Sequence, residues 1–195
     1  MPTSANPNLL SVDWSRIPAP DDDGAARHLE GVNLPDIPLP ATDGSLVSLA
    51  RRTGRVVVFA YPRTGEPGKP ALVADWDMIP GARGCTPQAC AFRDLHRELI
   101  AAGATDVFGL STQNTDYQLE AANRLHLPFA LLSDAKLTLT KALGLPTMHV
   151  AGVTLMKRLA LIIDDGHIAK VFYPVFPPDK NAAEVRGWLL EHQRR

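Results

Sequence analysis

The chain has 195 residues, of which 45% are hydrophobic and 21% are charged, and its formal net charge is −1. This composition is typical of a single globular domain with a full core, and the weak charge argues against nucleic acid or an anionic membrane as a partner. The N-terminus lacks the basic and apolar regions of a signal peptide, and no apolar run is long enough to span a membrane. We therefore expect a cytoplasmic protein, in which cysteines are more often catalytic, redox-active or metal-binding than structural.

The first half of the chain predicts an arm, a hairpin, a buried strand and a long loop. Residues 1–33 are rich in Pro, Asp and Ala and predict an extended arm with one helical turn near Asp22–Leu29. An Asp-Gly turn signal within residues 39–49 predicts a hairpin. The β-branched run at residues 55–62 predicts a buried central strand. Residues 63–84 form a Gly- and Pro-rich loop, and loops of this length are usually functional or mobile.

The second half alternates between helical and strand patterns. In chain order these are a helix over 86–102, a strand over 105–112, a helix over 114–127, a strand over 128–134, a helix over 135–145, a hairpin over 157–174 and a helix over 181–193. The crossovers predict a parallel core, and the hairpin adds antiparallel strands to it. We expect an α/β, thioredoxin-like fold with a mixed central sheet and helices on both faces, although periodicity alone allows other α/β sheets.

The chain has only two cysteines, Cys85 and Cys90, and both lie where the loop becomes a helix. Gly84 precedes the first of them, and a proline follows within the first helical turn, where proline is favoured. Cys85 is therefore expected among unpaired N–H groups at the positive end of the helix dipole, which favours a thiolate. Arg83 adds positive charge nearby.

The spacing of the two cysteines indicates a switch. On an intact helix their Cα atoms would be about 8.6 Å apart. A disulfide needs less than about 7 Å, so the two sulfurs can bond only if the first turns unwind. A small buried hydrophobe remains an alternative for Cys90.

Other kinds of site are poorly supported by the sequence. A zinc site needs about four Cys or His ligands at close spacing. His96 is the one histidine close in sequence to the two cysteines. His149 precedes a predicted strand and is one more residue that could reach the site. The GEPGKP segment lacks the spacing of a phosphate-binding loop. We expect no metal and no cofactor.

The segment GCTPQACAFRD resembles the active-site segment of peroxiredoxins of the Q type, the bacterioferritin-comigratory-protein group. In that group the pattern is Thr-Pro-Gly-Cys-Thr-x-Glu-Ala-Cys-x-Phe-Arg-Asp. The segments LPATDGSLVSLARRTGRVVVFAYP, LPFALLSDAKLTLTKALGL and KRLALIIDDGHIAKVFYPV are similar to other parts of the family. The resemblance implies that residues 34–195 form a thioredoxin-like peroxiredoxin domain that follows the arm.

The resemblance also implies a function for this chain as a thiol-dependent peroxidase acting on hydrogen peroxide or organic hydroperoxides. Cys85 would be the peroxidatic cysteine that becomes a sulfenic acid, and Arg158 would hold the thiolate and polarise the peroxide. Cys90 would be the resolving cysteine that forms an intramolecular disulfide with Cys85. Thioredoxin or a similar dithiol would reduce that disulfide, and the chain would be a monomer or a homodimer.

The sequence departs from the family pattern just before Cys85. The family usually has a threonine three residues earlier, where this chain has Ala82, and residues 65–84 look like an insertion. We expect Thr64 at the strand end to supply the missing hydroxyl, with Thr86 as a weaker candidate. Pro80 is expected to shield the site, and Trp76 to be the largest apolar residue of an unusual lid.

Two other functions use similar residues. A thioredoxin-like disulfide reductase normally has its cysteines at C-x-x-C spacing, whereas this chain has four residues between them. A redox sensor without peroxidase turnover is compatible with the same cysteine pair, and turnover with a recycling reductant would argue against it.

Overall fold

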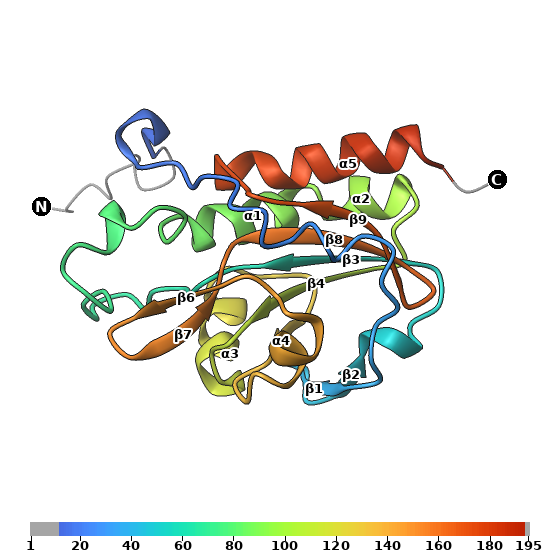
Figure 1. The fold of residues 1–195 in the computed structure, drawn as a ribbon, viewed down its shortest axis with the longest axis horizontal. Coiled ribbons are helices and arrows are strands. Elements are labelled where there is room, and N and C mark those ends of the chain that lie inside the picture. The colour runs from blue at the N-terminus through green and yellow to red at the C-terminus, as the bar shows by residue number, and fades with distance from the viewer. Residues whose placement is uncertain (1–11, 194–195) are drawn as a thin grey trace, which may run out of the picture.

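The centre of the protein is a five-stranded mixed sheet with the strand order β5-β4-β3-β8-β9 (Figure 1). The computed structural model describes residues 12–193, so residues 1–11 of the predicted arm lie outside the described residues. The strands are β3 (Arg55–Ala60), β4 (Asp106–Ser111), β5 (Leu131–Ser133), β8 (Leu159–Asp164) and β9 (His167–Phe172). β4 is parallel to β3 and to β5, whereas β8 is antiparallel to β3 and to β9, which confirms the mixed sheet.

Helices cover both faces of this sheet. They are α1 (Cys85–Asp94), α2 (His96–Ala101), α3 (Thr115–Arg124), α4 (Thr138–Leu143) and α5 (Asn181–Glu191). Two small hairpins complete the fold, β1 (Pro38–Pro40) with β2 (Leu46–Ser48) and β6 (Thr147–Val150) with β7 (Val153–Met156). Figure 1 shows α1, α2 and α5 along one face and α4 with the β1–β2 hairpin on the other.

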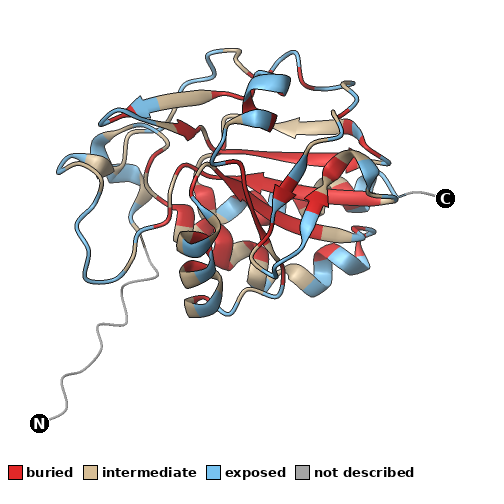
Figure 2. Ribbon diagram, turned by 90° about the horizontal axis from the view of Figure 1, so that it is seen from below, coloured by how far each residue is buried: buried red, intermediate tan, exposed pale blue. Residues whose placement is uncertain are grey.

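The alternation of side chains along β3 explains why the sheet has a core on each face. All six residues of β3 are buried. Val57 and Phe59 pack with α1, α2 and α5, whereas Val56 and Val58 pack with the β1–β2 hairpin and α4. A strand buried on both faces reads as a continuous apolar run, as this one does. Figure 2 shows the resulting layer of buried strands in the middle of the molecule.

One predicted helix was wrong in detail, and one hairpin of the structure was not predicted. The predicted helix over 86–102 is two helices, because Leu95 leaves helical geometry with φ −94° and ψ 6°. The β6–β7 hairpin was not predicted, since its turn consists of Ala151 and Gly152, both with positive φ, rather than an Asn-Gly or Asp-Gly pair. The hairpin over 157–174 is confirmed as β8 and β9.

The N-terminal arm packs along the domain in its described part. A short 3-10 helix covers Trp14–Arg16, and hydrogen-bonded turns occupy the segment where one helical turn was predicted. Ala26 and Leu29 are buried in the core shared with α4 and the β1–β2 hairpin, and Asn33 forms a β-bridge with His167. The arm therefore contributes to the core, and the division of the chain at residue 33 stays a prediction.

Candidate active site

Gly84 immediately precedes helix α1 and occupies a position that only glycine fits. Gly84 has a φ of 108°. A Cβ atom added there would lie 2.5 Å from Pro178 Cγ and 2.8 Å from Trp14 Cη2. Backbone conformation and packing therefore both require glycine at this position. Pro87 lies in the first turn of α1, where the N–H that proline lacks would have no helical partner.

The sulfur of Cys85 is buried and faces two hydrogen-bond donors. The residue is 3% exposed. The backbone N–H of Arg63, just beyond the end of β3, lies 3.4 Å from Sγ, and Nη2 of Arg158 lies 3.3 Å from it. In the thiol form, Sγ can donate to the carbonyl oxygen of Ala82 at 3.6 Å. Two donors, one of them permanently charged, stabilise the thiolate at this position.

Arg158 precedes β8 and is held by neutral acceptors. Its Nη1 donates to Oε1 of Gln88 at 2.5 Å. Its Nη2 donates to a set of backbone carbonyl oxygens 3.0–3.2 Å away, those of Gly81, Ala82 and Arg83. The side chain is 2% exposed, and within residues 12–193 no carboxylate forms an ion pair with it. The sulfur of Cys85 is thus the group beside this buried positive charge on which a negative charge would be stabilised.

Gln88 is a site residue that the sequence analysis missed. It is fully buried on α1, and its Nε2 donates to Oδ1 of Asn181, the first residue of α5, at 3.0 Å. The Oε1 atom of Gln88 accepts a hydrogen bond from Arg158, so this side-chain amide connects the guanidinium to α5. A polar residue on the buried side of α1, close to both cysteines, was the available signal.

Thr64 lies four residues after the end of β3, and its hydroxyl bonds to Gln113. Its Oγ1 and its backbone N–H both donate to Oε1 of Gln113, at 3.1 and 3.0 Å. Nε2 of Gln113 donates back to the carbonyl of Thr64 at 3.2 Å. Within the described part of the chain no hydrogen bond joins Thr64 to Cys85. This pairing fixes the backbone next to Arg63, whose N–H reaches the sulfur.

Cys90 lies in the middle of α1 and is 8% exposed. Both cysteines are free, and both belong to the apolar cluster between the sheet and helices α1, α2 and α5. Burial raises the pKa of the Cys90 thiol above its ordinary value. In the folded helix the Cys90 thiol is therefore harder to deprotonate than an exposed cysteine. Burial also raises the pKa of Tyr61, and the charge of the nearby Cys85 acts in the same direction.

The other candidates lie further from the sulfur. The Arg83 side chain forms an ion pair with Asp77, so its guanidinium is not the positive charge beside Cys85. His149 is exposed and bonds to Thr154, which contradicts the expectation that it could reach the site. Pro80 lines a pocket next to Arg158, and Trp76 lines a different pocket together with Thr64.

Within residues 12–193 the structure has neither a cluster of metal-ligand side chains nor a helix that could span a membrane. No three His, Cys, Asp or Glu side chains in that part of the chain are grouped so that they could hold a metal ion. None of the helices described there is long and apolar enough to cross a bilayer.

Comparison with known proteins identifies the family. Residues 29–186 match the Redoxin family. The chain belongs to the redoxin family. The chloroplastic peroxiredoxin Q of Sedum lineare is 33% identical to this redoxin over 162 residues, which cover 82% of this chain and 77% of that protein. The crystal structure of peroxidoxin BcpB from Mycobacterium tuberculosis superposes with a TM-score of 0.66 at 29% identity, covering 85% of this chain and 98% of that chain.

These matches confirm the resemblance to Q-type peroxiredoxins and the thioredoxin-like fold. The chloroplastic peroxiredoxin Q of Oryza sativa subsp. japonica is 34% identical over 158 residues. That alignment covers 80% of this redoxin and 64% of the rice protein. The chain therefore spans less than two thirds of the length of this relative.

Proposed function

We propose that this redoxin is a thiol-dependent peroxidase. The observation that carries the proposal is the environment of Cys85 Sγ. It lies 3.4 Å from a backbone N–H and 3.3 Å from a buried guanidinium, and within residues 12–193 no carboxylate forms an ion pair with that guanidinium. Such an environment favours a nucleophilic thiolate and stabilises negative charge that develops on a peroxide oxygen. The names of three curated relatives, two peroxiredoxins Q and one peroxiredoxin bcp, support the same reaction class.

In the first step the Cys85 thiolate attacks the terminal oxygen of the hydroperoxide. A sulfur–oxygen bond forms, the oxygen–oxygen bond breaks, and the leaving alkoxide or hydroxide takes a proton to become an alcohol or water. Cys85 is oxidised to a sulfenic acid and the peroxide is reduced. Arg158 donates to the sulfur and to the peroxide oxygens as charge moves from one to the other.

In the second step the Cys90 sulfur attacks the sulfenic sulfur. The Cys85–Cys90 disulfide forms and water leaves. Because α1 includes both residues in the reduced protein, its first turns must unwind before the sulfurs meet. A dithiol such as thioredoxin then reduces the disulfide and is itself oxidised, which returns the enzyme to its starting state.

The test of the proposed function is turnover by the unmodified protein. We expect steady consumption of hydrogen peroxide with a thioredoxin system as the electron source, measured by oxidation of the nicotinamide cofactor of the reductase. Formation of the disulfide without turnover, for any dithiol or small thiol supplied, would instead favour the redox-sensor alternative.

Thr64 is proposed as a positioning residue that also accepts a hydrogen bond from the peroxide. Thr64→Val removes the hydroxyl and leaves the Gln113 carbonyl without one of its donors. We expect kcat/KM for hydrogen peroxide to fall about 10-fold in this variant. Thr64→Ser keeps the hydroxyl and should restore most of the rate. Equal rates for both variants and the wild type, in stopped-flow oxidation of the reduced protein, would remove Thr64 from the site.

We propose a peroxide substrate and a dithiol reductant, with thioredoxin as the first to try, and a monomer or homodimer. The cytoplasmic location also stays a prediction, since the named relatives include chloroplastic proteins and a bcp protein of Coxiella burnetii.

A further inference from the structure

Part of the N-terminal arm packs against the loop that leads into Cys85. Cη2 of Trp14 lies 2.8 Å from the position that a Cβ atom on Gly84 would occupy, and Cβ of Pro20 lies 3.6 Å from the same position on Gly81. The match to the Redoxin family begins at residue 29, so both contacts come from a segment ahead of the matched region. The arm thus adds its own side chains to the packing at the start of α1.

The ring of Trp14 lies against two segments of the fold at once. Besides Gly84, it meets the ring of Phe176 edge-on, with the two centroids 6.0 Å apart. Pro178 comes two residues later, and its Cγ lies 2.5 Å from the same Cβ position on Gly84. The indole and the proline together fill the space beside Gly84, so the backbone at that residue is closely packed.

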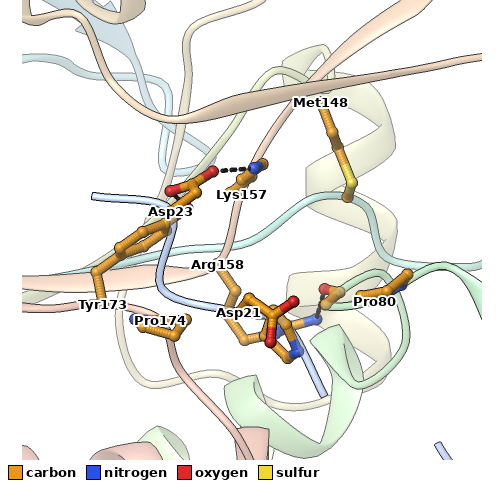
Figure 3. A pocket seen from close by; sticks show the side chains of 10 residues that line it. Asp21, Asp23, Pro80, Met148, Lys157, Arg158, Tyr173 and Pro174 are labelled. Carbon is orange, nitrogen blue, oxygen red and sulfur yellow. Dashed lines mark hydrogen bonds and ion pairs between the residues drawn. The ribbon is translucent and has the colours of Figure 1, made fainter. Parts of the chain in front are cut away.

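Hydrogen bonds hold the arm in place beyond Trp14. Asp23 accepts one from Nζ of Lys157 at 2.6 Å and another from the Tyr173 hydroxyl at 2.7 Å. Figure 3 shows Asp23 beside both of these side chains. Further along the arm, Leu29 is fully buried in the core. Trp14 is therefore attached to a segment that is itself anchored to the domain.

Gly84 lies at the end of α1 that must unwind before the two cysteines can bond. Its carbonyl oxygen accepts a hydrogen bond from the backbone N–H of Gln88 at 3.0 Å, in the first turn of the helix. Unwinding breaks this bond and moves Gly84 away from the indole. Because the contact exists only in the folded helix, it raises the free energy of the unwound form relative to the folded one. Trp14 therefore opposes the movement that brings Cys90 to Cys85.

The arm acts on this movement without contacting the reacting sulfur. The Cys85 sulfur faces the Arg63 N–H and the Arg158 guanidinium, both of which lie outside the arm. Truncating Trp14 leaves both donors in the chain. The attack on peroxide and the formation of the disulfide therefore depend on the indole to different extents.

We propose that Trp14 is a positioning residue for the resolving step, which holds the start of α1 in its helical form and so prolongs the life of the Cys85 sulfenic acid. The inference rests on the proposed peroxidase function and adds a control of its second step. A longer-lived sulfenic acid is open to attack on a second hydrogen peroxide molecule. In that side reaction a second sulfur–oxygen bond forms, the oxygen–oxygen bond breaks, water leaves, and Cys85 becomes a sulfinic acid.

The first test measures the opening of α1 without any peroxide. In Cys85→Ser the remaining cysteine is Cys90, which is 8% exposed, so its reaction with dithiodipyridine reports opening of the helix. Adding Trp14→Ala should raise the labelling rate about 10-fold, because opening no longer breaks the indole contact. Trp14→Phe keeps an aromatic ring against Gly84 and should restore most of the protection. An unchanged rate in Trp14→Ala would overturn the inference.

Two controls separate this contact from a general loss of stability. Arg16→Ala changes an exposed side chain of the same short helix and should leave the labelling rate unchanged. Val47→Ala truncates a buried side chain in the core on the opposite face of the sheet, and should lower the melting temperature without exposing Cys90. If Val47→Ala raised the labelling rate as much as Trp14→Ala, labelling would report global unfolding and the assignment would be wrong.

The second test follows the two steps of the peroxidase reaction separately in a single turnover. Trp14→Ala should keep the rate of Cys85 oxidation within about 2-fold of wild type and form the Cys85–Cys90 disulfide about 10-fold faster. The hydrogen peroxide concentration that converts half of Cys85 to sulfinic acid, measured by mass spectrometry, should rise about 10-fold. Equal disulfide rates and equal sulfinic acid yields in Trp14→Ala and wild type would contradict the proposed role.

The outcomes separate this inference from the function on which it rests. Faster labelling of Cys90 and faster disulfide formation in Trp14→Ala support both. Turnover of peroxide with unchanged labelling and disulfide rates overturns the role of Trp14 and leaves the peroxidase proposal standing. Faster labelling in a protein that consumes no peroxide supports the hold of Trp14 on α1 and refutes the peroxidase proposal.

Discussion

Replacing Cys85 with serine is expected to abolish peroxide reduction, lowering kcat/KM by at least about 1,000-fold. A serine hydroxyl at the start of α1 can still accept hydrogen bonds from Arg63 and Arg158. It does not ionise near neutral pH, so the donors remain and the nucleophile is lost. The measurement is the rate at which the reduced protein consumes hydrogen peroxide in a single turnover, with the melting temperature as a check on folding.

Replacing Cys90 with serine is expected to have a different result in the same assay. The first oxidation of Cys85 should proceed at close to the wild-type rate, because Cys90 is a buried thiol in the folded helix and contacts no donor at the site. Turnover with thioredoxin should stop, since no intramolecular disulfide can form, while a small thiol should restore it by reacting directly with the sulfenic acid.

The two variants together test the assignment of roles. Full turnover of Cys90→Ser with thioredoxin would contradict the intramolecular disulfide. Retention of peroxide consumption in Cys85→Ser would contradict the proposed nucleophile. Mass spectrometry of oxidised Cys90→Ser should show a sulfenic or sulfinic acid at Cys85, because the resolving sulfur is absent.

The parts of the site that the sequence predicted are those that depend on local rules. The Gly-Cys-Thr-Pro order at the start of α1 indicates a helix N-terminus from turn and capping preferences alone, and the structure begins the helix at Cys85. The apolar run at 55–62 and the hairpin over 157–174 follow from strand periodicity and a strong turn signal. Arg158 came only from the family resemblance, because no local pattern relates it to a cysteine 73 residues earlier.

The parts that the sequence did not predict depend on tertiary contacts or on the backbone. The Arg63 donor is a main-chain N–H, so no side-chain type signals it. The Gln88–Asn181 bond joins residues 93 positions apart, and its formation depends on how α5 packs against α1. The hydroxyl of Thr64 was expected to complete the peroxide site, and its hydrogen bond to Gln113, 49 residues away, could not be foreseen from the sequence. Each of these contacts depends on how the helices, strands and loops pack together.

Replacing Arg158 with methionine is expected to lower kcat/KM for hydrogen peroxide by roughly 1,000-fold, because the variant loses a buried charged donor 3.3 Å from the reacting sulfur. Stability should also fall, by about 1–3 kcal/mol, because Gln88 and the carbonyls of the loop before Cys85 lose their donor. The rate of Cys85 alkylation in the folded, reduced protein separates the two effects. Loss of the charged donor beside the sulfur should slow alkylation, whereas a loosened loop alone, which exposes the sulfur, should not.

Arg158→Lys keeps the charge and removes the planar fork. A single ammonium cannot bond at once to the sulfur, the Gln88 amide and the loop carbonyls, so we expect a loss of about 10–100-fold, between wild type and Arg158→Met. Arg97→Met is the matched control, because Arg97 is exposed on α2 and the substitution removes the same charge far from the sulfur. If Arg97→Met reduced the rate as much as Arg158→Met, net charge would explain the effect. If Arg158→Met retained the wild-type rates of peroxide reduction and alkylation, the positive end of α1 and the Arg63 N–H would suffice to activate Cys85.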